Sequence, residues 1–85
     1  MRKKTNKDVA QCEHNVVAAA EILVAAMKAY HLALEDDRAR PANSTLASAM
    51  AIAVRLQRTR AQLCDAEWTL YMRVEDLECA RKRSS

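Results

Sequence analysis

The sequence contains no glycine, no phenylalanine and a single proline among its 85 residues. Glycine supplies the positive φ angles that tight β-hairpin turns require, so its absence disfavours an antiparallel sheet. Glycine-rich loops also hold the phosphates of nucleotides, and without glycine a P-loop is excluded. Alanine instead occurs seventeen times, and it is the strongest helix former. The composition therefore predicts an all-α protein.

Large apolar residues are scarce as well. Leu, Ile and Val together number sixteen, and aromatic residues make up 4% of the chain. A chain of this length forms a single domain, here residues 1–85, and buries only about 60% of the surface that its unfolded form exposes. A core built mostly of alanine is thin, so we expect another protein chain to complete it.

The cysteines and histidines form no recognisable metal motif. Cys12, Cys64 and Cys79 include no Cys-x-x-Cys pair, and an odd number of cysteines is typical of free thiols in a reducing compartment. A zinc site needs four ligands that converge on the ion. In a hairpin centred near residue 40 or 41, Cys12 would lie opposite about residue 69, one or more turns from the other two thiols. We therefore expect no metal and no other cofactor.

No pattern of residues indicates catalysis. Acidic residues cluster at 35–37 and 75–78, but neighbouring positions on a helix point in different directions, which makes solvated faces the expected role. Carboxylates act as acid and base only in a cleft that separates their pKa values. The sequence therefore predicts a protein that is not an enzyme and has no small-molecule substrate.

The most apolar window runs from Asn15 to Leu34 and contains Glu21, Lys28 and His31. These polar residues interrupt it enough that we do not expect it to span a bilayer. We expect a soluble, cytoplasmic protein without a membrane partner.

Only one segment of the chain is unfavourable to a helix, the stretch from Asp36 to Thr45. Pro41 removes a hydrogen-bond donor and disfavours helical geometry at the residue before it. Candidate N-caps for a second helix follow at Asn43, Ser44 and Thr45.

At the other end of the first helix, Thr5 and Asp8 have the spacing of a capping box. We therefore expect one helix over residues 6–37, a connection over 38–43, a second helix over 44–81, and basic, frayed termini.

Apolar residues recur every three or four positions in both helices, the spacing of helices that pack together. The first helix has the series Val9, Val16, Ala20, Leu23, Met27, Tyr30 and Leu34, flanked by Val17 and Val24 on one side and by Ala19, Ala26 and Ala33 on the other. The second helix has Ala49, Ile52, Leu56, Thr59, Leu63, Ala66, Leu70 and Leu77. Two such helices form an antiparallel hairpin, which we expect to be completed as a four-helix bundle by dimerisation. The alternative is a three-helix bundle, if the second helix breaks near residues 58–60.

A second apolar stripe lies on the second helix, rotated by about 140° from the first. A two-helix hairpin can cover only one of the two stripes, so the other is available to a partner. Aromatic residues and methionine are typical of such interfaces. The predicted protein-binding residues are Met50, Val54, Trp68, Tyr71 and Met72. We expect the partner to be a second copy or a heterologous protein, the latter as for a small inhibitor, an adaptor or a chaperone-like protein.

Both termini are basic, and an antiparallel hairpin brings them to the same end. The residues concerned are Arg2, Lys3, Lys4, Lys7, Arg81, Lys82 and Arg83. Such an end can contact phosphate, so a nucleic-acid-associated regulator is the alternative function. Aromatic residues for base stacking are nearly absent, which favours the protein-binding interpretation.

In its architecture the pattern resembles the helical hairpins that pair into four-helix bundles, such as the plasmid regulator Rop. The resemblance consists of two helices, one short connection and layers that mix alanine with leucine-sized residues. It includes no shared residue motif, so it implies a fold and assigns no role to any residue.

Overall fold

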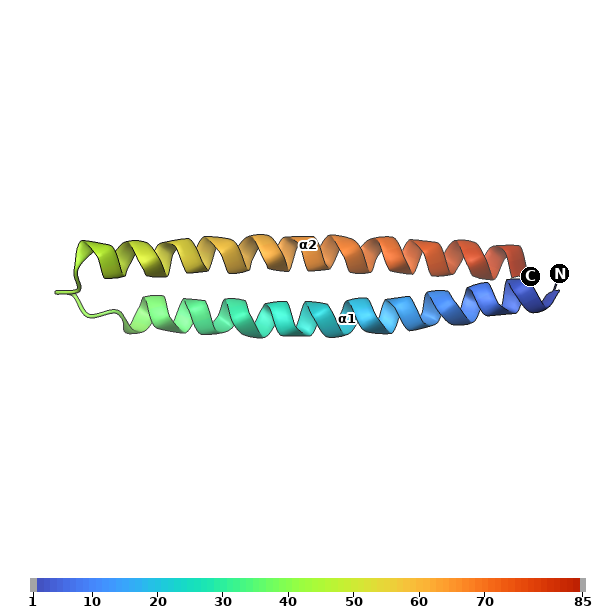
Figure 1. Cartoon of the computed structure of the whole chain (residues 1–85), viewed down its shortest axis with the longest axis horizontal. Coiled ribbons are helices and arrows are strands. Elements are labelled where there is room, and N and C mark those ends of the chain that lie inside the picture. Colours follow the sequence, from blue (N-terminus) through green and yellow to red (C-terminus); the bar gives the residue numbers. More distant parts are fainter. Residues whose placement is uncertain (1, 85) are drawn as a thin grey trace.

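The computed structural model describes residues 2–84, with side chains from residue 8 onward. Two helices, α1 (Arg2–Ala39) and α2 (Leu46–Ser84), run antiparallel as a hairpin, and no strand occurs in residues 2–84 (Figure 1). The molecule is a rod of 66 × 13 × 13 Å. The predicted all-α hairpin is confirmed. The three-helix alternative is wrong, because α2 continues unbroken through residues 58–60.

Both helices differ from their expected limits by a few residues. α1 begins at Arg2, ahead of the expected start near residue 6, and α2 continues past residue 81 to Ser84. Arginine and lysine are good helix formers, so nothing in the basic termini stops the helix. The Thr5 side chain of the predicted capping box lies outside the described side chains.

Thr45 is the N-cap of α2. Its Oγ1 accepts a hydrogen bond from the Ser48 backbone N–H at 3.1 Å, which satisfies one of the free donors at the helix start. The Ser44 N–H instead donates to the Pro41 carbonyl at 3.1 Å, closing a turn. Of the three candidate caps, Thr45 is therefore the one in use, and the helix starts at Leu46 rather than near residue 44.

The connection between the helices needs no glycine. No residue in the described part of the chain has a positive φ angle. An antiparallel pair of helices can thus be joined through residues 40–45 with ordinary backbone angles, whereas a tight β-hairpin could not. The absence of glycine is consistent with this hairpin.

The seam between the helices matches the prediction on α2, and on α1 it lies toward the alanine flank of the predicted series. On α2, Thr59, Ala66 and Leu77 are buried as expected. On α1 the most buried residues are Ala19 and Ala33, whereas Met27 of the expected series is 44% exposed. Alanine allows close approach of the helix backbones, so the flank with Ala19 and Ala33 faces α2.

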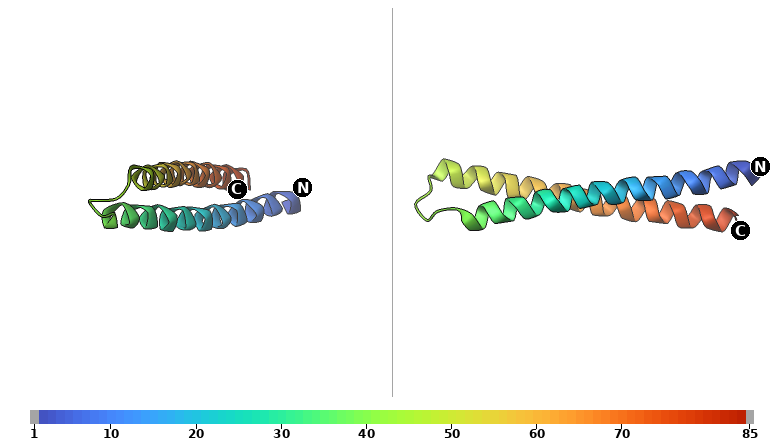
Figure 2. Two further views of the ribbon diagram at one scale, coloured as in Figure 1. Left: turned by 60° about the vertical axis from the view of Figure 1, so that its left-hand side comes forward. Right: turned by 90° about the horizontal axis from the view of Figure 1, so that it is seen from below.

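Two ion pairs between the helices define their register. Asp36 pairs with Arg55 near the connection, and Glu13 pairs with Arg81 near the termini. In both pairs the midpoint of the two residue numbers lies near 46. The predicted midpoint of the hairpin, near residue 40 or 41, is therefore wrong. As a result, the first turn of α2 extends past the end of α1 (Figure 1). The two views in Figure 2 show the helices side by side, crossing at a small angle.

The hairpin encloses little of its own apolar surface. The buried hydrophobic residues of the described chain are Leu77 and four alanines, and no large side chain is fully buried. The radius of gyration is 19.1 Å, compared with about 12 Å for a compact chain of this length. Most large apolar side chains are therefore left partly or wholly exposed.

Candidate interaction surface

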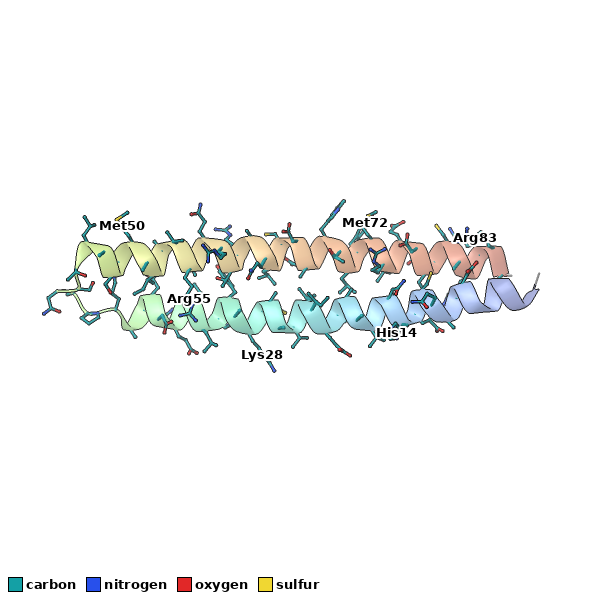
Figure 3. All side chains as sticks on the ribbon, in the orientation of Figure 1. His14, Lys28, Met50, Arg55, Met72 and Arg83 are labelled. Atoms are coloured by element: carbon teal, nitrogen blue, oxygen red, sulfur yellow. The ribbon has the colours of Figure 1, made fainter. Side chains whose placement is uncertain are left out.

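The five predicted protein-binding residues all lie on the exposed side of α2. Their exposed fractions are 58% for Met50, 51% for Val54, 65% for Trp68, 55% for Tyr71 and 42% for Met72. Figure 3 shows Met50 and Met72 pointing away from α1. We call these five residues the outer stripe.

An aromatic pair stands within the outer stripe. The rings of Trp68 and Tyr71 are stacked, with centroids 5.5 Å apart and planes inclined by 19°. A hydrogen bond to Glu75, together with its negative charge, raises the pKa of Tyr71 above its ordinary value of 10.0. The pair thus presents a flat apolar surface with a neutral hydroxyl group at one end.

Exposed apolar residues on α1 were not predicted as part of a surface. Val17, Val24 and Met27 are 57%, 50% and 44% exposed, and Ile22 and Leu32 are exposed as well. The sequence does contain a signal for this, because Val17 and Val24 are seven positions apart and so occupy equivalent places on the helix. Their spacing predicts a flank of the seam, whereas the buried flank is the one with Ala19 and Ala33.

The ion pair between Glu13 and Arg81 shows which apolar residues of the two helices share an edge. Residues seven apart occupy equivalent positions in paired helices, so Met27 follows Glu13 along one edge and Val74 precedes Arg81 along the same edge. Val24 and Tyr71 each lie three positions before one of these residues and adjoin them on their helices. We call this side the Glu13–Arg81 edge.

The opposite edge of the hairpin also carries an ion pair, that of Asp36 with Arg55. A shallow groove continues along it, lined mainly by Ile22, Ala25 and Ala29 of α1 and by Gln62, Asp65 and Thr69 of α2. The α2 wall of this groove is more polar than its α1 wall.

The back of α1 is charged. His14, Glu21, Lys28 and Glu35 repeat every seven residues, and all four are exposed. Figure 3 shows Lys28 pointing away from α2. This line of polar side chains is suited to water, and the exposed apolar side chains lie on the outer stripe, along the Glu13–Arg81 edge and, on the other side of this line, at Ile22 and Leu32.

The cysteines lie differently from the prediction. Cys12 and Cys79 line one hollow near the chain ends, together with Asp8, Asp76 and Lys82. This follows from the register, which places Cys12 opposite Cys79 rather than opposite residue 69. All three cysteines are free thiols. Among residues 8–84, no three metal-ligating side chains come together.

The termini meet at one end of the rod, as expected (Figure 1). Arg81 and Glu13 form an ion pair of 3.5 Å there. Lys82 and Arg83 line the same hollow as Asp8 and Asp76, so this hollow holds groups of both charges. The side chains of Arg2, Lys3, Lys4 and Lys7 lie outside the described residues.

The helical segment Asp8–Ala39 contains an 18-residue window that is apolar enough to cross a membrane by length and composition, with a mean hydropathy of 1.5. This differs from the expectation that Glu21, Lys28 and His31 interrupt it too strongly. Core helices of soluble proteins and signal sequences meet the same criterion, and only 11% of the window is buried in the hairpin. Its apolar side chains are thus available to a further partner, and the cytoplasmic location stays a prediction.

Comparison with known proteins gives no relative. The chain matches no protein-family model, no curated protein and no solved structure.

Proposed function

We propose that the chain is a non-catalytic protein–protein interaction module that pairs with a second copy of itself, giving a four-helix bundle. The observation that carries the proposal is the amount of surface that the hairpin leaves open. A compact monomer of 9.5 kDa exposes about 5,000 Å², whereas the hairpin exposes 6840 Å². The excess is about 1,800 Å² per chain.

An excess of this size suits a permanent dimer. If two chains each cover about 1,800 Å², the interface totals about 3,600 Å², within the range of about 2,000 to 5,000 Å² for obligate dimers. The exposed side chains have the required chemistry, because Trp68, Tyr71 and Met72 belong to types that anchor interfaces.

The test compares Trp68→Ala with Gln62→Ala, a control at an exposed position of the same helix on the opposite edge of the hairpin. Sedimentation equilibrium measures association, and circular dichroism at high protein concentration measures helicity. We expect Trp68→Ala to weaken association at least about tenfold, as truncation of an interface anchor does, while helicity is retained and the control stays unchanged. If Trp68→Ala associated as strongly as the wild type, the proposal that the outer stripe mediates self-pairing would be contradicted.

A nucleic-acid-associated regulator is the second candidate, favoured by the meeting of both basic termini at one end of the rod. Phosphate binding by such an end weakens steeply as salt is raised. We would titrate RNA and DNA at two salt concentrations with the wild type and with Arg81, Lys82 and Arg83 all changed to Ala. Absence of binding at low salt, or binding that the triple variant leaves unchanged, would eliminate this function.

A further inference from the structure

We propose that the two copies are related by a two-fold axis passing near Cys64, with the two α2 helices antiparallel and the Glu13–Arg81 edges facing each other. This inference rests on the proposed self-pairing and specifies its geometry. Cys64 is exposed, and it lies between the two apolar ends of the α2 surface, Met50 and Val54 on one side and Trp68 to Val74 on the other.

The α2 surface is self-complementary about Cys64. In a two-fold antiparallel pair, a residue before the axis meets the residue equally far after it in the other copy. On the Glu13–Arg81 edge, Ala53 lies eleven positions before Cys64 and Val74 ten positions after it, so these two exposed apolar residues come side by side. Four positions away, the exposed Arg60 meets the exposed face of Trp68, as in a cation–π contact.

The charges on this surface favour the same orientation. Arg60 and Glu67 are exposed, and neither belongs to an ion pair in the described part of the chain. No charged residue lies three or four positions from either of them on α2. Antiparallel pairing about Cys64 brings Arg60 of one copy beside Glu67 of the other. Parallel pairing in the same register sets Arg60 against Arg60 and Glu67 against Glu67, which like-charge repulsion disfavours.

The same axis also matches apolar residues on α1. The register of the hairpin places the segment around Ala29 level with Cys64. Val24 and Leu34 lie five positions before and after Ala29, on the Glu13–Arg81 edge. A two-fold axis at this level therefore brings Val24 of one copy to Leu34 of the other. Both helices then contribute to one apolar interface, as in a four-helix bundle.

Cross-linking with a short-arm bis-maleimide tests the arrangement in the full-length chain. One variant keeps only Cys64 (Cys12→Ala with Cys79→Ala), and its matched control keeps only Cys79 (Cys12→Ala with Cys64→Ala). Both thiols are exposed on α2. In the proposed dimer the two Cys64 thiols are close, whereas the two Cys79 thiols lie about 45 Å apart at 1.5 Å rise per residue.

We expect covalent dimer from the Cys64 variant and none from the Cys79 variant, with both variants dimeric by light scattering. Covalent dimer from the Cys64 variant and from the Cys79 variant alike would indicate parallel α2 helices and overturn the inference. Dimers that neither thiol cross-links would overturn the axis near Cys64 while leaving self-pairing intact. Monomers at every concentration would overturn self-pairing and this arrangement together.

Discussion

At the scale of single residues, alanine sets the closeness of the two helices. Ala33 and Ala80 are each 1% exposed, and they are the most buried hydrophobic residues described. A methyl side chain leaves the facing backbone and its neighbours room to approach. The price is a small apolar contact area, which is why the hairpin buries so little.

Enlarging one seam alanine should push the helices apart. We predict that Ala33→Leu lowers the free energy of unfolding by about 1 to 3 kcal/mol, because an overpacked seam forces side chains from their preferred rotamers. Ala25→Leu, at an exposed position of α1 on the opposite edge of the hairpin, should change it by no more than about 0.5 kcal/mol. Urea denaturation at one fixed protein concentration measures both. An equal effect of the two substitutions would argue against close alanine packing.

Tyr71 gives a prediction about pH. Glu75 raises the pKa of Tyr71, through a hydrogen bond first and its charge second, and Glu78 adds to the effect. A raised pKa means that the folded state is favoured while Tyr71 is protonated, and that this contribution is lost as the pH rises through the raised value.

In a Tyr30→Phe background, which leaves Tyr71 as the sole tyrosine, Glu75→Gln should lower the pKa of Tyr71 towards 10.0. Removal of the negative charge makes tyrosinate easier to form. Titration followed by ultraviolet absorbance measures the shift. An unchanged or raised pKa in Glu75→Gln would show that Glu75 is not the cause.

At the scale of elements, the start of α2 depends on one hydroxyl group. Thr45 caps the helix through Ser48, while the Ser44 backbone belongs to the turn that begins at Pro41. From the sequence, Asn43, Ser44 and Thr45 are equally good candidates for the N-cap. The turn that begins at Pro41 leaves Thr45 in the capping position.

We predict that Thr45→Ala lowers the free energy of unfolding by about 1 kcal/mol, the usual cost of losing an N-cap. Ser44→Ala is the matched control and should cost no more than about 0.5 kcal/mol. Thermal or urea unfolding measures the difference. If Ser44→Ala lowered the free energy of unfolding more than Thr45→Ala, the N-cap would be Ser44 and the assignment of Thr45 would be wrong.

The sequence predicts the elements well and their mutual placement less well. The two helices and the α2 seam follow from Pro41 and from leucines that recur on one face. On α1 the expected series is half-buried except for Met27, which has the spacing of a buried residue but is exposed, while the fully buried positions are Ala19 and Ala33 on one flank. The predicted register differs from the observed one because the midpoint of the paired residues does not fall at Pro41. Asp36 pairs with Arg55, which places this midpoint near residue 46.

The same reasoning explains what was missed in the candidate site. The outer stripe of α2 could be predicted, because it is separated from the seam by a large rotation around the helix. The apolar residues of the Glu13–Arg81 edge could not be assembled, because the edge joins two helices and depends on their register. The ion pair of Glu13 with Arg81 supplies that register.

At the scale of the whole molecule, the hairpin has the shape of half a bundle. It is 66 Å long and 13 Å across, with a charged back on α1 and apolar side chains on the outer stripe and the Glu13–Arg81 edge. A rod two helices thick cannot enclose large side chains on its own. A second copy placed on the apolar surface would enclose them.

The most direct test of this central claim is the molar mass in solution, measured by light scattering after size-exclusion chromatography over a wide range of concentrations. Self-pairing predicts a mass of about twice the 9.5 kDa of one chain, falling only when the protein is strongly diluted. A constant mass of 9.5 kDa up to the highest concentration, with the chain still helical and Trp68 still exposed, would contradict it.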